Sequence, residues 1–505
     1  MTASELMLEN LHASATAIFQ DALDACNIET AFDRRIRFEG HTLHRLIEGG
    51  EGPQSLDLKT FKTIQVIAIG KAAVPMLNTL LARMPRRLGL RGICCSVEIP
   101  EKRNWRVRYF EGGHPLPSEG SFAAARATLA LLRKATKSTL VIFLLSGGGS
   151  ALFDLPLDGD ISLDDTMAFH QALIGSGAPI TEINTVRKHF SAVKGGRLAM
   201  ACAEAAKLSI LLPDVPLRSL DILASGPTYP DQTTVEDALA ILKRYALMDK
   251  FPEAVQAFFK RADLPESPGN KSRVAAFLPR MPWSGKVAEM LPGKLPGILS
   301  EKVGGLLAGA RKSASMESED AAFHNSMFEV LLSSHDLVES ARARAESAGY
   351  FTVIDNSCDD WDYADAARYL LYRFHELRAE HPRCCLISGG EVTVTLDRTP
   401  GAGGRNMQFA LAAAIELADH AGTDGGADLV VFSAGSDGID GNTRSAGAIA
   451  DPTTVSRAVE FGYDPAEALA SFNACPLFTA LGDTVVTGPT GHNLRDLRLL
   501  ISEPA

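Results

Sequence analysis

Four segments of this chain join an apolar, β-branched run to a glycine turn that carries a polar side chain. They read VIAIGKAA at 66–73, VIFLLSGGGSA at 141–151, CLISGGEVT at 385–393 and VVFSAGSDGIDG at 430–441. A buried parallel strand that ends in glycines exposes backbone N–H groups at its carboxyl edge, which is where open α/β sheets bind ligands. The repetition therefore predicts an α/β fold with an anion site at the strand ends.

The side chains at these four corners differ in chemistry. One cation, two hydroxyls and three carboxylates are present, and this mixture predicts a site for phosphate and metal ions. They are Lys71, Ser146, Ser150, Glu391, Asp437 and Asp440.

Length, composition and net charge indicate the size of the protein and which binding partners are unfavourable. With 505 residues the chain is long enough for two or three domains, and its apolar share of 46% and charged share of 22% are typical of a globular protein. A net charge of −11 argues against a surface for nucleic acid or an anionic membrane. A small anionic substrate would therefore need a local basic pocket. The sequence is compatible with a homo-oligomer as well as with a monomer.

The cysteines and the N-terminus bear on location. Neither adjacent pair, Cys94-Cys95 or Cys384-Cys385, forms a C-x-x-C motif, which predicts reduced, buried thiols. The first residues lack a basic leader, and no apolar run reaches the ~20 residues that span a bilayer. We expect a cytoplasmic protein without a membrane segment.

Strand, turn and helix alternate along the first half of the chain. This order predicts a parallel sheet with helices on both faces. Further strands are expected at 92–97, 139–146 and 208–214, and helices at 72–84, 118–135, 163–177, 183–205 and 238–248.

The sequence pattern changes between about 262 and 326, where proline and glycine interrupt every periodic arrangement of apolar residues. We therefore expect domains at 1–262 and 327–505, with an insertion or linker at 263–326. In the second α/β domain, helices are expected at 333–349 and 363–381, and strands at 385–388, 392–396 and 429–435.

The SGGGS turn at 146–150 is the strongest anion signal. Its three glycines carry no Cβ, so backbone N–H groups can approach an oxyanion, and the two serines add hydroxyl donors. No GK[ST] follows, so the turn is not a Walker A motif. A tight corner without a ligand is the alternative, but three glycines exceed what a corner needs.

Two cations occupy similar corners. Lys71 stands where an apolar strand meets a helix and can neutralise phosphate charge. The alternative, a solvated lysine, is disfavoured by the helix dipole. Arg405 follows two glycines and precedes a helix, so it can grip a carboxylate or phosphate bidentately, with Asn406 beside it. Surface capping is the alternative for Arg405.

The carboxylates predict a metal site. Asp437 and Asp440 follow a strand among glycines and suit Mg²⁺, although a series of Asx turns explains the same spacing. Asp214, at the end of an expected strand, could be a metal ligand, a general base or a turn cap. The GPTGHN loop at 488–493 could close over a ligand.

Taken together, these motifs resemble the glycerate 2-kinase family with a C-terminal MOFRL domain. The resemblance covers roughly 60–260 and 327–502. It implies an N-terminal Rossmann-like domain, a smaller α/β MOFRL domain and an active site in the cleft between them. It also implies ATP- and Mg²⁺-dependent phosphorylation of D-glycerate at the 2-hydroxyl, giving 2-phosphoglycerate and ADP. The motifs are, in order, GKAA, GGHPLP, LSGGGSALF, NTVRKHFSAVKGGRLA, DILASGPTYPD, SGGEVTVT, GGRNMQFAL, GSDGIDG and GPTGHNLRDLRL.

The resemblance implies that Lys71 and Arg405 are the catalytically important pair. We expect Asp437 and Asp440 to hold Mg²⁺, and Asp214 to act as a base or metal ligand. The residues expected to bind the nucleotide are Ser146, Gly147, Gly148, Gly149, Ser150, Gly488 and Thr490, and those expected to bind D-glycerate are Lys71, Ser150, Arg405 and Asn406.

The chain departs from the family pattern in places, and other functions stay open. Pro213-Asp214 stands where Ser-Asp is usual, and 266–325 is longer than the usual connection. A hydroxypyruvate or tartronate oxidoreductase is one alternative, although no G-x-G-x-x-G follows the first strand. The other is a non-catalytic hydroxy-acid or phosphosugar sensor, which would have no use for the aspartate pair.

Overall fold

The computed structural model describes residues 3–46, 54–85, 89–269, 322–419 and 429–504. These residues form two compact units. Residues 1–31 group with the C-terminal part of the chain rather than with the residues that follow them. Most of the expected insertion lies outside the described residues, and the expected domain limits stay a prediction. We call the units the Lys71 unit (Phe32–Leu211 and Ser219–Leu331) and the Arg405 unit (Met1–Ala31, Leu212–Arg218 and Leu332–Ala505).

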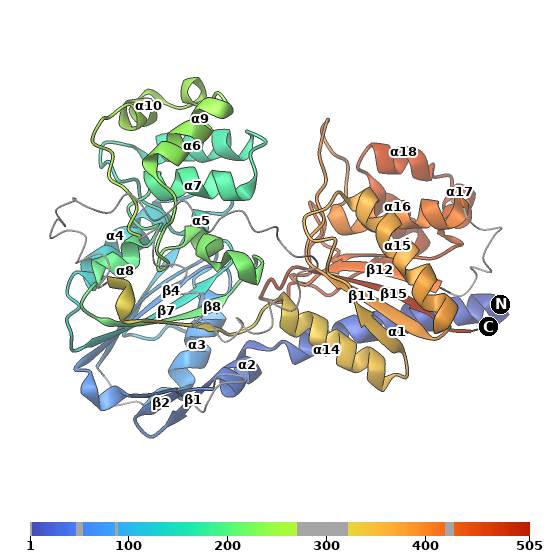
Figure 1. Ribbon diagram of the computed structural model, residues 1–505, viewed down its shortest axis with the longest axis horizontal. Helices are drawn as coiled ribbons and strands as arrows, with labels where there is room; N and C mark the ends of the chain where they lie inside the picture. The colour runs from blue at the N-terminus through green and yellow to red at the C-terminus, as the bar shows by residue number, and fades with distance from the viewer. Residues whose placement is uncertain (1–2, 47–53, 86–88, 270–321, 420–428, 505) are drawn as a thin grey trace, which may run out of the picture. The chain divides into compact units, whose positions relative to one another are not determined.

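A six-stranded sheet forms the centre of the Lys71 unit, in the order β6-β5-β4-β7-β8-β9. Figure 1 labels its strands β4, β7 and β8. The pairings of β4 with β5, β4 with β7, β5 with β6 and β8 with β9 are parallel, as predicted. Ile69 pairs with Leu145 near the carboxyl ends of β4 and β7, so the Lys71 and SGGGS corners are neighbours. The strands are β4 (Thr63–Ile69), β5 (Leu90–Ser96), β6 (Val107–Glu111), β7 (Thr139–Ser146), β8 (Ala206–Leu212) and β9 (Ser326–Val330).

Most helices of this unit lie where the apolar spacing predicts them. Ser118, Ser162 and Thr234 each cap a helix, accepting a hydrogen bond from the N–H three residues on. The helix expected at 183–205 is broken, because the backbone is extended at Ser191 and turns at Gly196, where φ is +79°, before α8 begins. The helices are α3 (Ala73–Arg83), α4 (Glu119–Leu132), α5 (Gly149–Leu152), α6 (Leu163–Ile174), α7 (Ile180–Phe190), α8 (Arg197–Ala201), α9 (Val235–Arg244) and α10 (Glu253–Phe259), with the 3₁₀ segments η1 (Leu58–Thr60), η2 (Leu217–Ser225) and η3 (Met248–Lys250).

A small antiparallel sheet joins the edge of this unit. Its Arg45 forms a buried ion pair with Glu329 of β9, with Nη2 and Oε2 3.1 Å apart. The sheet therefore anchors the outer strand β9. Its strands are β1 (Ile36–Glu39), β2 (Thr42–Arg45) and β3 (Gln54–Asp57).

The Arg405 unit has a mixed sheet in the order β10-β11-β15-β12-β13-β14. β11 and β12, which carry the third and fourth corners, both pair antiparallel with β15, which lies between them. Gly435 pairs with Asp496, so the start of β15 joins the two corners at one edge. The strands are β10 (Phe351–Ile354), β11 (Cys384–Gly389), β12 (Leu429–Gly435), β13 (Gly447–Ala450), β14 (Thr484–Val485) and β15 (Asp496–Ser502).

The first helix of the chain packs on this mixed sheet. Phe19 lies against Phe432 of β12, with ring centroids 5.0 Å apart. The strand expected at 392–396 is wrong, because only Thr393 forms a bridge, to Asp362. The helices are α1 (Ala3–Ala25), α14 (Ser334–Ser347), α15 (Tyr363–Glu380), α16 (Arg405–Asp419), α17 (Thr454–Glu460), α18 (Pro465–Ala470) and α19 (Ala474–Leu481), and α2 (Ile28–Arg35) leads from one unit to the other.

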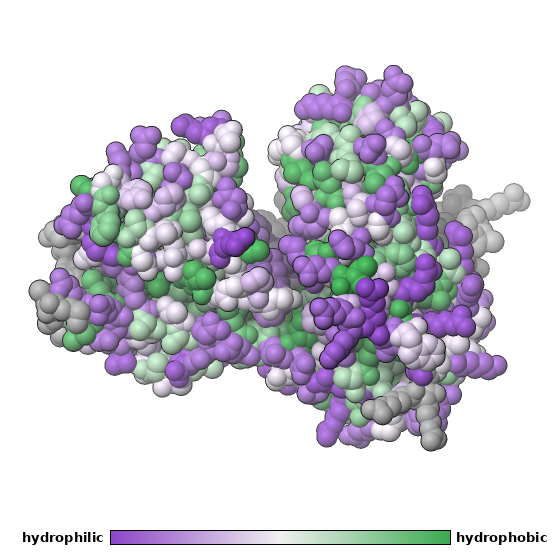
Figure 2. All heavy atoms as spheres, turned by 180° about the vertical axis from the view of Figure 1, so that it is seen from behind, coloured by the Kyte–Doolittle hydropathy of each residue, from purple (hydrophilic) through white to green (hydrophobic). Residues whose placement is uncertain are grey.

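The cysteines are free and mostly buried, as expected from the sequence. All eight cysteines are free and seven are buried, while Cys475 is half-buried. Figure 2 shows hydrophilic and hydrophobic residues interspersed over the face that it draws. Of the helices in the described residues, none combines the length and apolar character needed to cross a membrane.

Candidate active site

The Lys71 corner is held in place by Ser146. Gly70 has a φ of +118°, and an added Cβ would stand 2.3 Å from the Ser146 Oγ. That Oγ accepts a hydrogen bond from the Ala72 N–H at 3.0 Å, and the Lys71 N–H donates to the Gly147 carbonyl at 2.9 Å. Ser146 is buried, which differs from the nucleotide contact that we expected, whereas the Lys71 side chain is exposed.

The glycine turn lies against two basic side chains. Gly148 has a φ of +79°, and a Cβ there would meet the Lys71 stem at 3.1 Å and the His114 ring at 3.3 Å. Glycine at this position therefore lets both side chains lie on the turn. Burial and the Lys71 ammonium lower the pKa of His114, so its imidazole is neutral at pH 7.

Ser150 is tied to α7 and η2 through hydroxyl contacts. Its Oγ lies 2.9 Å from the Ser225 Oγ, which donates to the Asn184 Oδ1 at 2.8 Å. A Cβ on Gly149 would stand 2.6 Å from the Ala224 Cβ, so the glycine admits this close approach. The hydrogen bonds therefore hold the end of the SGGGS turn in one place.

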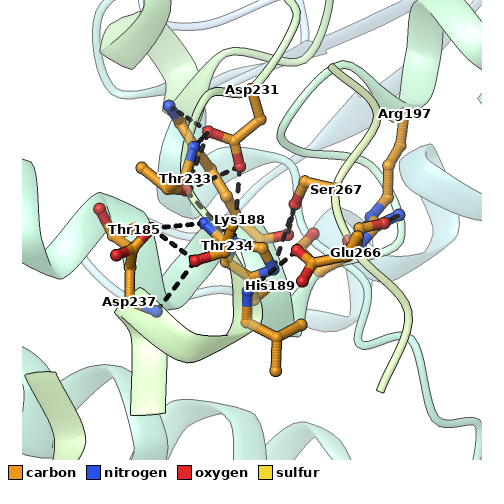
Figure 3. Close-up of polar contacts among 12 residues, drawn as sticks. Thr185, Lys188, His189, Arg197, Asp231, Thr233, Thr234, Asp237, Glu266 and Ser267 are labelled. Atoms are coloured by element: carbon orange, nitrogen blue, oxygen red, sulfur yellow. Dashed lines mark hydrogen bonds and ion pairs between the residues drawn. The ribbon is translucent and has the colours of Figure 1, made fainter. Parts of the chain in front are cut away.

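Helix α7 also carries a buried ion-pair cluster (Figure 3). Lys188, which is 3% exposed, donates to Asp231 at 3.3 Å. It also donates to Asp221 at 3.2 Å. Asp231 is completely buried and also accepts from the Thr233 hydroxyl, whereas Asp221 is 46% exposed. Lys188 therefore anchors η2, the segment that positions Ser225.

A second buried network follows the SGGGS turn. Asp154 accepts from His170 Nε2 at 2.7 Å and from the Ser191 Oγ at 2.6 Å, and it pairs with Lys194. Burial raises the pKa of Asp154, but Lys194 and His170 outweigh that effect and hold the pKa below its usual value. Burial lowers the pKa of His170 to about 4. This network fixes the chain that leaves the turn.

Arg405 begins α16 and lies between two carboxylates. Its Nε and Nη2 donate to the two oxygens of Asp496 at 2.5 and 3.1 Å, and Nη2 lies 2.6 Å from the Glu391 Oε1. Asp496 is buried, while Arg405 is 36% and Glu391 25% exposed. The third corner thus presents a partly exposed cation and carboxyl above a buried carboxylate.

Glu391 has an unusual proton affinity. Burial raises its pKa to about 7, although the Arg405 charge acts in the opposite direction. Burial also opposes the charge of Arg405, but Asp496 and Glu391 outweigh it and raise the pKa of the guanidinium. A carboxyl that titrates near neutral pH is suited to proton transfer.

Two further arginines support the third corner from within. Arg495 donates to both oxygens of Asp359 at 2.9 and 2.6 Å, and Asp359 accepts the Glu391 N–H at 3.2 Å. Arg498 is completely buried and donates to the Gly390 carbonyl at 3.0 Å. These contacts fix the backbone on both sides of Glu391.

Asp440 caps the start of α16. One oxygen accepts from the N–H and the side-chain amide of Asn406 at 3.0 and 3.2 Å, and the other accepts from the Met407 N–H at 2.9 Å. Asn406 is buried and also accepts from the Ser433 Oγ at 2.7 Å. These contacts differ from the metal and substrate roles that we expected for Asp440 and Asn406.

The GPTG loop is packed on the fourth corner. The Thr490 Oγ1 donates to the Ser436 carbonyl at 2.7 Å, and the Thr490 N–H donates to the Asp437 carbonyl at 3.4 Å. A Cβ on Gly438 would meet the Gly488 carbonyl at 2.0 Å. Thr490 therefore uses its hydroxyl to hold the loop, and Gly488 lies against the Asp437 turn.

Two carboxylates, those of Asp437 and Asp496, lie beside Gly435. A Cβ on Gly435 would stand 3.3 Å from an oxygen of Asp437 and 3.3 Å from one of Asp496. Mg²⁺ is often held by one or two carboxylates with substrate phosphates, so Asp437 fits such a role and Asp440 does not. Asp214 is half-buried and helps to raise the Glu391 pKa. In the described ranges, no three His, Cys, Asp or Glu residues are arranged to hold a metal ion.

Two models of known protein families match this chain. Residues 14–260 match a model described as a domain of unknown function, DUF4147, and residues 384–496 match the MOFRL family. A glycerate 2-kinase of Pyrococcus horikoshii is 32% identical over 443 residues, which cover 87% of each chain. The chain belongs to the glycerate 2-kinase family.

The fold agrees with membership of the glycerate 2-kinase family. A crystal structure of a Thermotoga maritima glycerate kinase (EC 2.7.1.31) has a TM-score of 0.73 and 29% identity, covering 98% of this chain and all of its own. The predicted fold class of two α/β domains and the family resemblance are confirmed. An Agrobacterium vitis relative that is 33% identical, covering 86% of each chain, is named putative hydroxypyruvate reductase.

The roles of two side chains in this site, Asp496 and Glu391, were not predicted from the sequence. The sequence does not single out Asp496, because the antiparallel placement of β15 between the third and fourth corners has no local pattern. Glu391 was noted but had no predicted role, because the pKa near 7 arises from burial. The glutamate directly after two glycines at a strand end was the available signal.

Proposed function

We propose that this protein transfers the γ-phosphoryl group of ATP to the 2-hydroxyl of D-glycerate, giving 2-phosphoglycerate and ADP. The observation that carries the proposal is the partly exposed pair of Arg405 and Glu391, a fixed cation beside a carboxyl with a pKa of about 7. The P. horikoshii relative is named glycerate 2-kinase and a T. maritima relative is named D-glycerate 2-kinase, and both names support phosphorylation at this position.

The Arg405 unit supplies the groups for the acceptor. Glu391, as a carboxylate, takes the proton of the 2-hydroxyl while that oxygen bonds to the γ-phosphorus. The bond from the γ-phosphorus to the bridging oxygen breaks, and ADP leaves with that oxygen. Arg405 binds the glycerate carboxylate and is held in orientation by Asp496. Asp214 favours the proton-accepting role of Glu391 by raising its pKa.

The Lys71 unit supplies groups for the phosphates. The Lys71 ammonium neutralises charge on the transferring phosphoryl group, and the N–H groups of 147–150 bind nucleotide oxygens. In the Arg405 unit, the Gly488 N–H is a further backbone donor, in a loop that Thr490 holds through its own hydrogen bonds. Mg²⁺ bound with the nucleotide would be held by Asp437, and it would supply neutralisation of phosphate charge.

A hydroxypyruvate reductase is the second candidate, because the A. vitis relative carries that name. Two parallel assays on the purified chain separate the candidates. The first follows ADP release with D-glycerate and ATP, with and without Mg²⁺, and the second follows NADH or NADPH oxidation with hydroxypyruvate. We expect ADP release that requires both D-glycerate and Mg²⁺. Oxidation of NAD(P)H without ADP release would establish the reductase, and D-glycerate binding with neither activity would establish a sensor.

A further inference from the structure

A basic cavity lies in the Lys71 unit, away from the Lys71 and SGGGS corners of that unit. It has a volume of about 730 Å³ and lies among β5, β6 and the end of α4. Arg91 is the second residue of β5 and Arg108 the second of β6. Because both strands run parallel to the strand that leads to Lys71, their first residues lie at the opposite edge of the sheet. The cavity is therefore separate from the Lys71 and SGGGS corners.

The charge of this cavity is strongly one-sided. Its described lining holds four basic side chains, Arg91, Arg106, Arg108 and Lys134, and no acidic one. The whole chain carries a net charge of −11, so the gathering of cations does not follow from composition. Among the described residues no carboxylate pairs with Arg91, Arg108 or Lys134. Unpaired like charges in one concavity raise the local concentration of small anions.

Aromatic contacts orient two of the guanidinium groups. The Arg106 guanidinium lies 5.0 Å from the ring centroid of Trp105, and the Arg108 guanidinium lies 5.1 Å from that of Phe110. The Arg108 guanidinium, stacked on its ring, keeps its N–H edge available for a phosphate. Trp105 lines the cavity and is 86% exposed, so its other face is open to a flat ligand.

The end of α4 does not cancel this positive charge. A helix ends in carbonyl oxygens that disfavour an anion. Here the Leu131 carbonyl accepts from the Lys134 N–H at 3.1 Å and from the Gln65 side chain at 3.2 Å, and the Leu132 carbonyl accepts from the Ala135 N–H at 2.9 Å. The Leu131 and Leu132 carbonyls at the end of α4 therefore already have donors.

We propose that this cavity is a second anion site, which binds a small molecule through its phosphate group. Its volume is within the range of ligand pockets, about 300–1,000 Å³. Inorganic pyrophosphate and a nucleotide share this chemistry. A long nucleic acid is the less suitable occupant, because the net negative charge of the chain opposes a polyanion that extends beyond the cavity.

The test follows tryptophan fluorescence and calorimetric heat while the full chain, as Lys71→Met, is titrated with pyrophosphate and, separately, with ADP. The Lys71 change reduces phosphate binding at the active site. We expect saturable binding whose fluorescence change is lost in Trp105→Phe. The double variant Arg108→Gln, Lys134→Gln should weaken binding by about tenfold or more. The double variant Lys243→Gln, Lys250→Gln, which removes two exposed positive charges elsewhere in the unit, and the single variant Lys250→Gln should both leave it unchanged.

The two probes identify the ligand source, and other outcomes overturn the proposal. Tighter binding of ADP that depends on Trp105 would identify a nucleotide, and equal binding would identify the phosphate group alone. Binding that is the same in Arg108→Gln, Lys134→Gln and in the two control variants, with unchanged thermal unfolding of each, would refute the site. Tighter, length-dependent binding of an oligonucleotide would assign the surface to nucleic acid instead.

Discussion

The proton affinity of Glu391 has a direct consequence for activity. Because burial raises its pKa to about 7 and only the carboxylate accepts a proton, kcat/KM should rise with pH through about 7. Glu391→Gln should lower kcat by roughly 10² to 10⁴ and abolish that rise. A pH series of steady-state rates for both proteins checks this. Normal turnover of Glu391→Gln with an unchanged profile would remove Glu391 as the base.

The same shift fixes the sign of a stability effect. The folded-state pKa of Glu391 lies above its usual value of 4.5, so the folded protein binds the proton more tightly between these two pH values. The free energy of unfolding should therefore fall as pH rises through about 7. This fall should be smaller in Glu391→Gln, because glutamine does not titrate. Measuring the free energy of unfolding of this variant also shows whether a lower kcat comes from loss of the base or from loss of the fold.

Lys71 provides a second test at the residue scale. The backbone and Ser146 hold the turn, and among the described residues the exposed Lys71 ammonium makes no hydrogen bond that the corner needs. Lys71→Met should therefore lower kcat by two or more orders of magnitude, roughly the effect of losing a charge at the transferring phosphoryl group, while thermal unfolding stays unchanged. Lys59→Met, at an exposed lysine of η1, is the matched control. Equal kcat values for the two variants would contradict the proposed role.

At the scale of elements, the contact between β4 and β7 sets the first two corners. Gly70→Ala would place a Cβ 2.3 Å from the Ser146 Oγ and 2.5 Å from its carbonyl oxygen. We expect a loss of more than about 2 kcal/mol in the free energy of unfolding, because a backbone atom must move. Gly462→Ala has a similar positive φ with no atom within 4 Å of its Cβ, and should cost about 1 kcal/mol. Urea unfolding compares the two, and equal losses would disprove close packing at Gly70.

The start of α16 makes the role of Asp440 testable. Asp440→Asn removes a charge that accepts three hydrogen bonds, so unfolding should become easier by roughly 1–3 kcal/mol. Asp437→Asn should leave stability unchanged and raise the Mg²⁺ concentration needed for half-maximal rate. Thermal melts and Mg²⁺ titrations distinguish the variants. If Asp440→Asn instead changed only the Mg²⁺ requirement, Asp440 would be a metal ligand.

The elements differ in how far the sequence predicts them. The buried strands β4 and β7 and the capped helices α4 and α6 are local patterns, and their predictions are confirmed. The antiparallel pairing of β15 depends on contacts distant in sequence, so no period of apolar residues reports it. For the same reason the partner of Arg405 could not be predicted, although the exposed corner that carries Arg405 could.

At the scale of the whole molecule, each unit is built from segments that are not continuous in the sequence. Helix α1 has an apolar face that predicts a helix but not its partner, and it packs on β12 through Phe19 and Phe432. The chain then builds the Lys71 unit and returns to the Arg405 unit at 212–218 and 332–505. Composition predicts more than one domain, but only tertiary packing decides which segments share a core.

The most direct test of the central claim is the position of the phosphate in the product. The full chain is incubated with ATP, Mg²⁺ and D-glycerate, and the mixture is followed by ³¹P NMR against standards of 2- and 3-phosphoglycerate. We predict a 2-phosphoglycerate signal that grows in step with ADP. ADP formation with only 3-phosphoglycerate, or no phosphorylated glycerate at all, would contradict the proposed function.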